Sequence, residues 1–259
     1  MADDTLLVSR EGAIATLQFN RPEALNALNL EMALAFLAAM REIAADNTVR
    51  AVVLKGAGRA FIAGGDLAVL RANPVEGART LLGPLNEAIR LMHQMDAPII
   101  AQVHGASAGG GLSLMLMCDF VLAAEGSKFN LAYINLGTNC DLGGSWALPR
   151  LTGLRHALEI ALLGESLSAE DALRLGLINR VLPAGELQTA TQALARCLAS
   201  GPTLAYGRMK RLMRESFDRD LASQLEAEAL SFEACAGTDD LREGLEAFFE
   251  RRPPVFRGH

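Results

Sequence analysis

The sequence has few cysteines and no metal-binding motif, and these shortages exclude several classes of protein. Its 259 residues include four cysteines and four histidines. The cysteines are scattered and form no CxxC pair, which is typical of free thiols in a reducing compartment. No histidine stands at metal-ligand spacing from them, so we expect no metal site. The cysteines are Cys118, Cys140, Cys197 and Cys235.

Long apolar runs and an excess of positive charge are also missing. No uncharged apolar stretch reaches the roughly 18 residues of a membrane helix, because Asp119 interrupts the best candidate. The first ten residues, MADDTLLVSR, are acidic and unlike a secretory signal. The net charge is -6, and no basic stripe with interleaved aromatic residues occurs, which argues against nucleic acid as a partner. We therefore expect a cytoplasmic protein that binds neither a membrane nor a nucleic acid.

Apolar residues, by contrast, make up 51% of the chain, enough for a sizeable core. Short apolar runs alternate with helical patterns, which predicts an α/β architecture. Beyond Gly201 and Pro202 the apolar spacing is helical, so we expect a core over 1–200 and a helical region over 201–259 that packs against another subunit. Strands are expected at 6–8, 14–19, 51–54, 98–103 and 178–182, and an amphipathic helix capped by Asn29 is expected to run to about Ala45.

Two glycine-rich turns stand out, each between a predicted strand and a predicted helix. The first is PIIAQVHGASAGGGLSLMLMCD at 98–119, and the second is GAGRAFIAGGDL at 56–67. Glycines let another molecule approach the backbone, and the first N–H groups of a helix have no partner within it. Backbone alone therefore offers a site for an oxyanion or a phosphate. The alternative is a tight corner whose glycines serve packing only. A nucleotide-binding P-loop is excluded, because GGG is not followed by Lys and Ser or Thr.

Asp141 is the one charged residue between Phe129 and Arg150, in an apolar but irregular stretch. A lone carboxylate among glycines and apolar residues is either a helix cap or a site residue. From composition alone the cap is the preferred interpretation, because aspartate is a favoured N-cap.

Six stretches together resemble the crotonase (enoyl-CoA hydratase/isomerase) family, in the family's order and over nearly the whole chain. The resemblance implies a ClpP-like spiral of ββα units followed by a C-terminal helical region that forms a homotrimer or a dimer of trimers. It implies acyl-CoA thioesters as substrates, with coenzyme A as part of the substrate and with no metal or redox cofactor. The six stretches are NRPEALNAL at 20–28, FIAGGDL at 61–67, the stretch at 98–119, LGTNCDLGGSWALPRLTG at 136–153, ALLGESLSAEDALRLGLINRVLP at 161–183 and EGLEAFFERR at 243–252.

The resemblance also implies a set of site residues by motif position. The backbone N–H groups of Ala63 and Gly110 would form the oxyanion hole, in agreement with the two glycine turns. Asp66 would mainly fix its own loop. Arg251 would lie near the CoA phosphate, or would simply be a favourable cation in the last helical turn. The other residues that the resemblance places along the CoA or the acyl group are Ala24, Leu25, Gly64, Gly65, Leu67, Tyr133, Trp146 and Phe248, of which Tyr133 and Trp146 are candidate walls of the acyl pocket or ordinary core.

The catalytic side chains depart from the hydratase pattern. A typical hydratase of this family has two glutamates, and here those positions are Ser113 and Tyr133. Hydroxyl groups with pKa values far above neutrality are poor general bases, so the sequence places hydratase activity second. Asp141 occupies a third position, and members with an acid there alone resemble Δ3,Δ2-enoyl-CoA isomerases and 1,2-epoxyphenylacetyl-CoA isomerases. Isomerisation needs only one base, which takes a proton from C2 and returns it to C4 of the dienolate.

Three further hypotheses remain beside these two. Family dehalogenases use an aspartate as a nucleophile, but they also have a tryptophan and a histidine nearby; Tyr133 stands at the tryptophan's place, and His93 is near only in sequence. Cys140 is a candidate thiol nucleophile with no positioned histidine, so packing is the preferred role. The third hypothesis is a non-catalytic acyl-CoA-binding trimer, in which the Asp141 carboxylate points away from the oxyanion hole.

Overall fold

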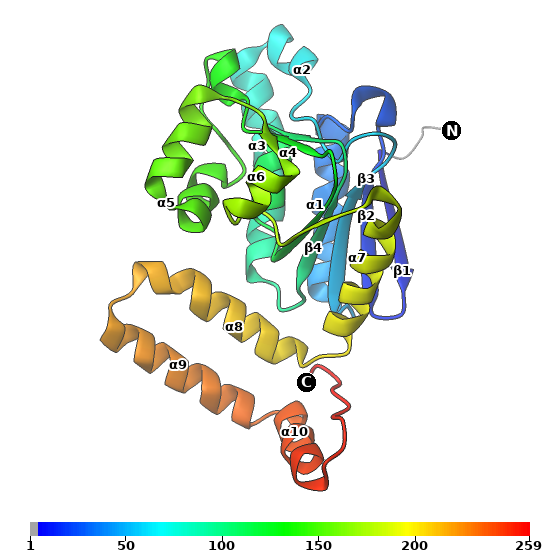
Figure 1. Ribbon diagram of the computed structural model, residues 1–259, viewed down its shortest axis with the longest axis vertical. Helices are drawn as coiled ribbons and strands as arrows, with labels where there is room; N and C mark the ends of the chain where they lie inside the picture. Colours follow the sequence, from blue (N-terminus) through cyan, green and yellow to red (C-terminus); the bar gives the residue numbers. More distant parts are fainter. Residues whose placement is uncertain (1–4) are drawn as a thin grey trace.

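The computed structural model describes residues 5–259, and a six-stranded sheet lies at its centre (Figure 1). An antiparallel hairpin begins the sheet, and four parallel strands continue it, as the alternation of strands and helices predicts. All five predicted strands are present. The order is β1 (Leu6–Glu11), β2 (Ile14–Phe19), β3 (Ala51–Gly56), β4 (Ile99–Val103), β6 (Phe120–Ala124) and β9 (Arg180–Leu182).

Helices cover both faces of this sheet, which is why its central strands are apolar throughout. On one face α1 (Leu30–Ala45) packs against α3 (Pro74–Gln94), and on the other lies α7 (Ala184–Ala199). In β3, Val52 and Leu54 join the core under α1, whereas Ala51 and Val53 join the core under α7. The predicted cap of α1 is confirmed, because the Asn29 side chain accepts a hydrogen bond from the Met32 N–H at 2.9 Å.

A second, three-stranded sheet contains strands that the sequence patterns did not predict. Its strands are β5 (Ala106–Ala108), β7 (Lys128–Asn130) and β8 (Leu167–Ser168). The β5 residues Ala-Ser-Ala carry no strand signal and look like part of the turn, yet they pair with β7 in parallel register. The unit is therefore strand, strand, helix, ending in α4 (Gly110–Leu116). The remaining elements of this part are η1 (Pro22–Ala24), α2 (Leu67–Ala72), η2 (Tyr133–Leu136), α5 (Gly144–Leu163) and α6 (Ala169–Arg174).

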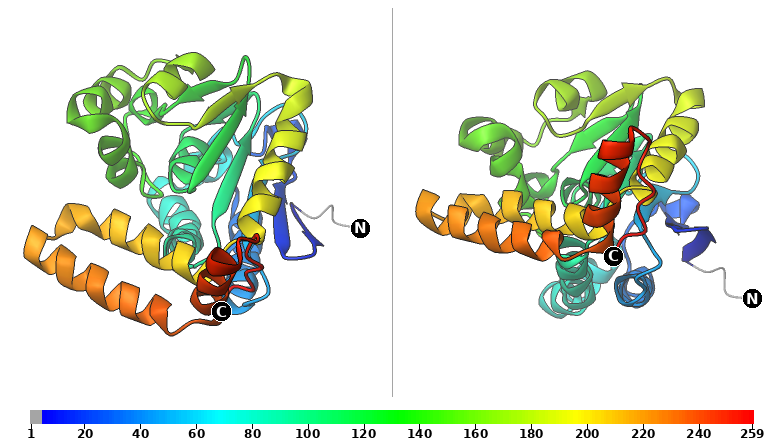
Figure 2. Two further views of the ribbon diagram at one scale, coloured as in Figure 1. Left: turned by 60° about the horizontal axis from the view of Figure 1, so that its bottom comes forward. Right: turned by 90° about the horizontal axis from the view of Figure 1, so that it is seen from below.

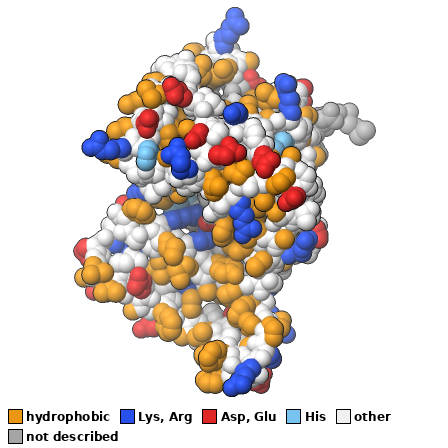
Figure 3. Space-filling view, in the orientation of Figure 1, with side chains coloured by type: hydrophobic (Ala, Val, Ile, Leu, Met, Phe, Trp, Pro, Cys, Tyr) orange, Lys and Arg blue, Asp and Glu red, His pale blue; other side chains and the backbone are white. Residues whose placement is uncertain are grey.

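The last three helices form an arm beside the core (Figures 1 and 2). They are α8 (Thr203–Glu215), α9 (Leu221–Ala236) and α10 (Asp239–Glu250), with the short η3 (Ser216–Asp218) between the first two. The predicted division at residue 200 falls between α7 and α8. The apolar face of α9 is largely exposed in the single chain, and Figure 3 shows hydrophobic side chains gathered over this part. An apolar face of this kind is typical of a surface that another protein covers. It includes Leu221, Leu225 and Phe232, which are 75%, 55% and 71% exposed.

One arginine ties both ends of the arm to the core. Arg50, which precedes β3, donates hydrogen bonds to the Thr203 hydroxyl and to the Phe256 carbonyl, both at 3.1 Å, and also to the Gly201 carbonyl. The chain after α10 is in turn held by Asp240, whose carboxylate accepts a hydrogen bond from the Gly258 N–H at 2.8 Å. The arm therefore leaves the core and returns to it at the same place.

Candidate active site

The three consecutive glycines at the start of α4 meet three different demands. Gly109 has φ 50° and ψ -124°, a conformation that side chains disfavour. Gly111 is packed so closely that a Cβ there would lie 2.2 Å from the Ile62 carbonyl oxygen. A Cβ at Gly110, by contrast, would make ordinary contacts at 3.5 Å with Leu28 and Leu142 side chains. Turn geometry and packing thus account for Gly109 and Gly111, whereas Gly110 faces a space with room for a small group.

The Ala63 N–H is not available as an oxyanion donor, which corrects the role predicted for it. It donates a hydrogen bond to the Leu25 carbonyl oxygen at 3.0 Å. A donor that is already paired within the protein offers little to a substrate oxygen, because the new bond would only replace the old one.

Gly65 is the residue of this loop whose N–H is turned toward the glycine triplet. The Leu28 N–H donates to the Gly64 carbonyl and the Asp66 N–H donates to the Leu28 carbonyl, both at 2.8 Å. This parallel bridge leaves the N–H of Gly65 on the side opposite Leu28. That side faces the 106–109 segment, because Ile62 is bridged to Ser107. Over residues 5–259, neither the Gly65 nor the Gly110 N–H donates to a backbone carbonyl. The loop's hydrogen bonding, which sequence spacing does not reveal, is what distinguishes Gly65 from Ala63.

The residues of η1 and of the 63–67 loop that are predicted to lie along the CoA are brought together at the same edge. Ala24 and Leu25, at the end of η1, lie against the 63–67 loop through the bond between Leu25 and Ala63. Asp66 has the fixing role expected for it, because its carboxylate accepts the Ala68 N–H at 3.1 Å and pairs with Arg21 at 3.1 Å. Leu67 is half exposed at the start of α2.

Asp141 lies beside Gly110 and does not cap a helix. Its Oδ1 atom would be 3.7 Å from a Cβ on Gly110. The helix that follows is α5, whose N-cap is Gly143 and has no side-chain cap bond, so the capping interpretation of Asp141 is wrong. The next residue, Leu142, has φ 49°, in a region that non-glycine residues rarely adopt. Such strain is often found at functional sites, where the surrounding structure fixes an unfavourable conformation.

Two hydroxyl groups connect Asp141 to the positions of the missing glutamates. The Tyr133 hydroxyl donates a hydrogen bond to Asp141 Oδ1, and Ser113 Oγ lies 3.0 Å from the Tyr133 oxygen. Burial raises the pKa of Asp141, whereas the Tyr133 hydrogen bond acts against this rise. Burial is also the main cause that raises the pKa of Tyr133, so its hydroxyl stays protonated at neutral pH. Tyr133, a candidate wall of the acyl pocket, is thus a hydrogen-bond partner of the acid.

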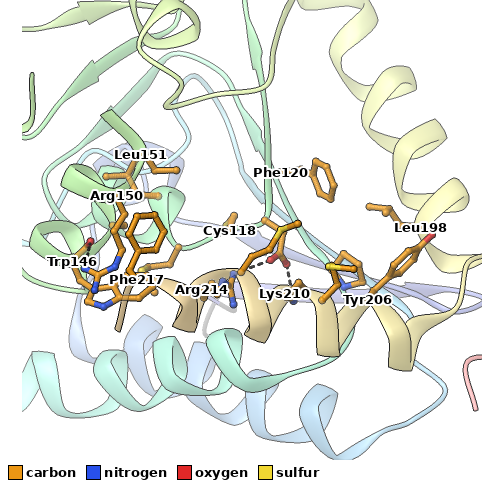
Figure 4. Close-up of a pocket in the computed structure, with 17 residues that line it drawn as sticks. Cys118, Phe120, Trp146, Arg150, Leu151, Leu198, Tyr206, Lys210, Arg214 and Phe217 are labelled. Atoms are coloured by element: carbon orange, nitrogen blue, oxygen red, sulfur yellow. Dashed lines mark hydrogen bonds and ion pairs between the residues drawn. The ribbon is translucent and has the colours of Figure 1, made fainter. Parts of the chain in front are cut away.

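Trp146 lines a cavity that neither Tyr133 nor Asp141 lines, and its place in the acyl pocket stays a prediction. Its ring is 5.4 Å from the His93 ring, and the Arg150 guanidinium is 4.2 Å from its centroid. Figure 4 shows Trp146 and Arg150 together with Phe217 at one end of this cavity, which lies between the core and α8 and has a volume of about 500 Å³. The cavity is lined by the C-terminal end of α4, whereas Asp141 lies near its N-terminal end.

Phe248 and Arg251 do not join the site within one chain. They lie on and just after α10, at the opposite end of the molecule from α2 (Figure 1), and Phe248 is 77% exposed. Among the described residues, no group of three His, Cys, Asp or Glu side chains is placed to hold a metal ion. Over the same range, no helix is long and apolar enough to cross a bilayer.

A sequence model of the enoyl-CoA hydratase/isomerase family matches residues 9–259. The chain belongs to this family. The crotonase resemblance of the six motifs is thereby confirmed.

Relatives within the enoyl-CoA hydratase/isomerase family carry more than one activity in their names. The chain is 38% identical to 1,2-epoxyphenylacetyl-CoA isomerase of Escherichia coli K12, over 96% of both chains. It is 33% identical to crotonyl-CoA hydratase of Syntrophomonas wolfei, over 99% of both. The crystal structure of an enoyl-CoA hydratase from Bacillus anthracis superposes with a TM-score of 0.93 at 30% identity, covering 98% of this chain and all of that one. The predicted α/β crotonase fold is confirmed, and the chain is an acyl-CoA enzyme of the hydratase/isomerase type.

Proposed function

We propose that the protein is an enoyl-CoA isomerase that moves a double bond from C3 to C2 of an acyl-CoA, with Asp141 as its single acid and base. The observation that carries the proposal is the position of the Asp141 carboxylate, whose Oδ1 would lie 3.7 Å from a Cβ on Gly110. No cofactor is proposed beyond the CoA moiety of the substrate itself.

The chemistry follows from this arrangement. The Gly65 and Gly110 N–H groups bind the thioester oxygen, where negative charge develops when C2 loses a proton. Two fixed donors stabilise that charge, and one such donor is worth roughly 3 kcal/mol in comparable sites. Asp141 takes the proton from C2, becomes a carboxylic acid, and returns the proton to C4 of the dienolate. The half-buried carboxylate suits the task because burial raises its pKa and makes it a stronger base.

Hydration of a 2-enoyl-CoA is the second candidate, and the name of the Syntrophomonas relative favours it. The side chains argue against it. A hydratase must hold and deprotonate a water, but the Ser113 and Tyr133 hydroxyls bind each other, and Tyr133 also binds Asp141. The non-catalytic binding hypothesis is weakened, because the acid lies next to Gly110 rather than away from it.

The test is a direct assay of both reactions on the wild type and on Asp141→Asn. We expect the wild type to convert a 3-enoyl-CoA into the conjugated 2-enoyl-CoA, measured by ultraviolet absorbance, and the variant to lose this activity. Asp239→Asn, a substitution of an exposed aspartate in α10, is the matched control. Hydration of a 2-enoyl-CoA that survives in Asp141→Asn would refute the proposal and favour the hydratase. Tight binding of an acyl-CoA without turnover of either substrate would favour the binding protein.

We also propose that the chain assembles as a homotrimer or a dimer of trimers through the arm. The exposed apolar face of α9 supports this assembly, because water contact with that face is unfavourable. In such an assembly Phe248 and Arg251 are free to lie over the acyl-CoA of a neighbouring subunit. Light scattering should give three or six times the 27.6 kDa of one chain. A monomer at micromolar concentration would contradict this proposal.

A further inference from the structure

Ser113, Tyr133 and Asp141 form a chain of hydrogen bonds that runs in one direction. An ionised carboxylate only accepts, so the single Tyr133 proton is directed to Asp141 Oδ1. The Tyr133 oxygen is then the acceptor in its 3.0 Å contact with Ser113, and the Ser113 hydroxyl is the donor. Each hydroxyl therefore points its proton toward Asp141.

We propose that Ser113 and Tyr133 are positioning residues that hold the Asp141 carboxylate through its Oδ1 atom, beside Gly110 and in the ionised form that takes the substrate proton. This inference rests on the proposed function and deepens it. It assigns a role to the two residues that stand where a hydratase has glutamates.

The backbone around Tyr133 is arranged to keep its hydroxyl in place. The preceding residue, Ala132, has φ 52°, a conformation that alanine rarely adopts. That conformation is held by a 2.7 Å hydrogen bond from the Ala132 N–H to the Asn130 side chain. On the other side, the Tyr133 carbonyl accepts the Thr138 N–H at 3.2 Å. A residue fixed on both sides loses little further conformational freedom when its side chain binds Asp141.

Ser113 is equally restricted. It lies in α4 with no exposed surface, and its N–H donates to the Gly109 carbonyl at 3.0 Å. A Cβ at Gly144 would lie 2.5 Å from Ser113 Oγ, so the hydroxyl is packed against the start of α5. The buried Ser113 hydroxyl is hydrogen-bonded to the Tyr133 oxygen. Because a buried hydroxyl needs a partner for its proton, this favours Ser113 as the donor.

The linked hydroxyl groups of Tyr133 and Ser113 are the main polar support of the Asp141 side chain. Tyr133 faces it from η2, Gly110 faces it from α4, and Leu142 and Leu28 approach the same space. Cys140 is the neighbouring titratable group in the loop. Over residues 5–259, no Lys, Arg or His forms an ion pair with Asp141. Because no positive charge compensates for burial, the ionised state depends on the Tyr133 hydroxyl first and on the backbone N–H of Asp141 second.

The proton balance of the reaction is simple under this assignment. The substrate proton moves from C2 to the Asp141 carboxylate, which becomes a carboxylic acid, and the same proton then moves from Asp141 to C4. The Tyr133 proton stays on Tyr133 throughout, because its pKa is raised. A hydrogen bond donated to a carboxyl group stabilises its charged form more than its neutral form. The linked hydroxyls of Tyr133 and Ser113 therefore favour the ionised form of Asp141 in the resting enzyme.

The test compares Tyr133→Phe and Ser113→Ala with Tyr206→Phe, which removes the hydroxyl of the other of the chain's two tyrosines. The pKa of Asp141 is measured by carbon-13 NMR on protein labelled at the aspartate carboxyl groups, with Asp141→Asn to assign the signal. We expect Tyr133→Phe to raise this pKa by about one unit, Ser113→Ala to raise it less, and Tyr206→Phe to leave it unchanged. An unchanged pKa in Tyr133→Phe would overturn the proposal.

Kinetics provide the second readout. In Tyr133→Phe the rising limb of the pH profile of kcat/KM for the 3-enoyl-CoA, which reports the free enzyme, should move to higher pH by the same amount. A loss of kcat without movement of the limb would show a structural defect rather than the proposed role. The NMR titration does not depend on turnover, so it decides the hydroxyl chain even if the isomerase assay fails.

Discussion

Helix α4 has an aspartate beside each end, and the two carboxylates are held in opposite ways. Asp119, beyond the C-terminal end, pairs with Lys210 and Arg214 of α8, each at 2.8 Å, and accepts the Ile99 N–H at 2.8 Å. Asp141, beside the N-terminal end, has a hydroxyl partner and, over residues 5–259, no ion pair. The first carboxylate is neutralised where it stands, whereas the second keeps its charge unbalanced.

This difference separates a structural acid from a reactive one. The Asp119 side chain is 10% exposed and joins the core to the arm (Figure 4 shows Lys210 and Arg214 on α8). Removing one partner of such a buried pair leaves the others without compensation. Asp141 is costly to ionise, and this cost is what makes it a base. The comparison therefore predicts that the two residues affect different properties when each is changed to asparagine.

The largest expected effect is on activity. Asp141→Asn should lower kcat for the 3-enoyl-CoA by about 1,000-fold, in the range of general acid–base contributions. Asp119→Asn should keep most of the activity of whatever protein remains folded, because its contacts lie at the other end of α4. Steady-state assays on folded fractions of matched purity would measure kcat for both variants. Equal losses of kcat would contradict the assignment of one aspartate to catalysis and the other to structure.

The second effect is on stability and has the reverse order. Asp119→Asn should lower the free energy of unfolding by about 3 kcal/mol, because Lys210 and Arg214 are left without a counter-charge. Asp141→Asn should be neutral or stabilising, because it removes a charge that burial disfavours. Urea unfolding followed by circular dichroism gives both values. A destabilised Asp141→Asn would mean that its charge contributes to folding.

The third effect compares adjacent glycines at the Asp141 end of α4. Gly110→Ala should fold normally, since its methyl group would make ordinary contacts, but should lower kcat about tenfold by crowding the oxyanion hole. Gly111→Ala should instead destabilise the fold, because its methyl group would meet the Ile62 carbonyl. Thermal unfolding alongside the isomerase assay separates the two, and a fully active Gly110→Ala would argue against this placement of the hole.

The smallest effect is the pH dependence of stability. The folded pKa of Asp141 lies above its ordinary value of 3.8, so the folded protein binds this proton more tightly than the unfolded chain does. The resulting stabilisation is complete below that value and is lost as the pH rises through the folded pKa. Asp141→Asn does not titrate at this position, so its advantage over the wild type should grow from about pH 4 to about pH 7, by about 1.4 kcal/mol for each unit of pKa elevation. A difference that shrinks over this range would contradict the direction of the shift.

Local patterns were enough to predict the cap of α1 and most strands, although the cap predicted at Asp141 is wrong. Asn29 caps α1 and Thr238 caps α10 through bonds to residues three positions away, so the signal is contained in a few neighbouring letters. The β5 strand was missed because its pairing partner, β7, is distant in the sequence. The composition of three residues does not indicate that they pair with a distant strand.

The sequence predicted the outline of the candidate site correctly and its details wrongly. The reason is again that the deciding contacts join residues that are distant in the sequence. Motif order located both glycine turns and Asp141, but the choice between Ala63 and Gly65 depends on which N–H the Leu25 and Leu28 carbonyls accept. The link between Tyr133 and Asp141 likewise joins two loops whose orientation the sequence does not record. Residue type indicates what chemistry is available, and three-dimensional contacts decide which group performs it.

The contacts of Arg50 have a consequence for how the arm can vary. Because one guanidinium holds both Thr203 and Phe256, the 50-odd residues between them form a segment whose two ends meet at the core. Lengthening such a loop costs little additional closure entropy. Helices of a different length could therefore replace α9 and α10 without moving the strands that carry the glycine turns, whereas α8 is also fixed to the core by the ion pairs of Asp119. Subunit contacts, and with them the substrate contacts proposed for Phe248 and Arg251, could in this way change while the glycine turns and Asp141 stay in place.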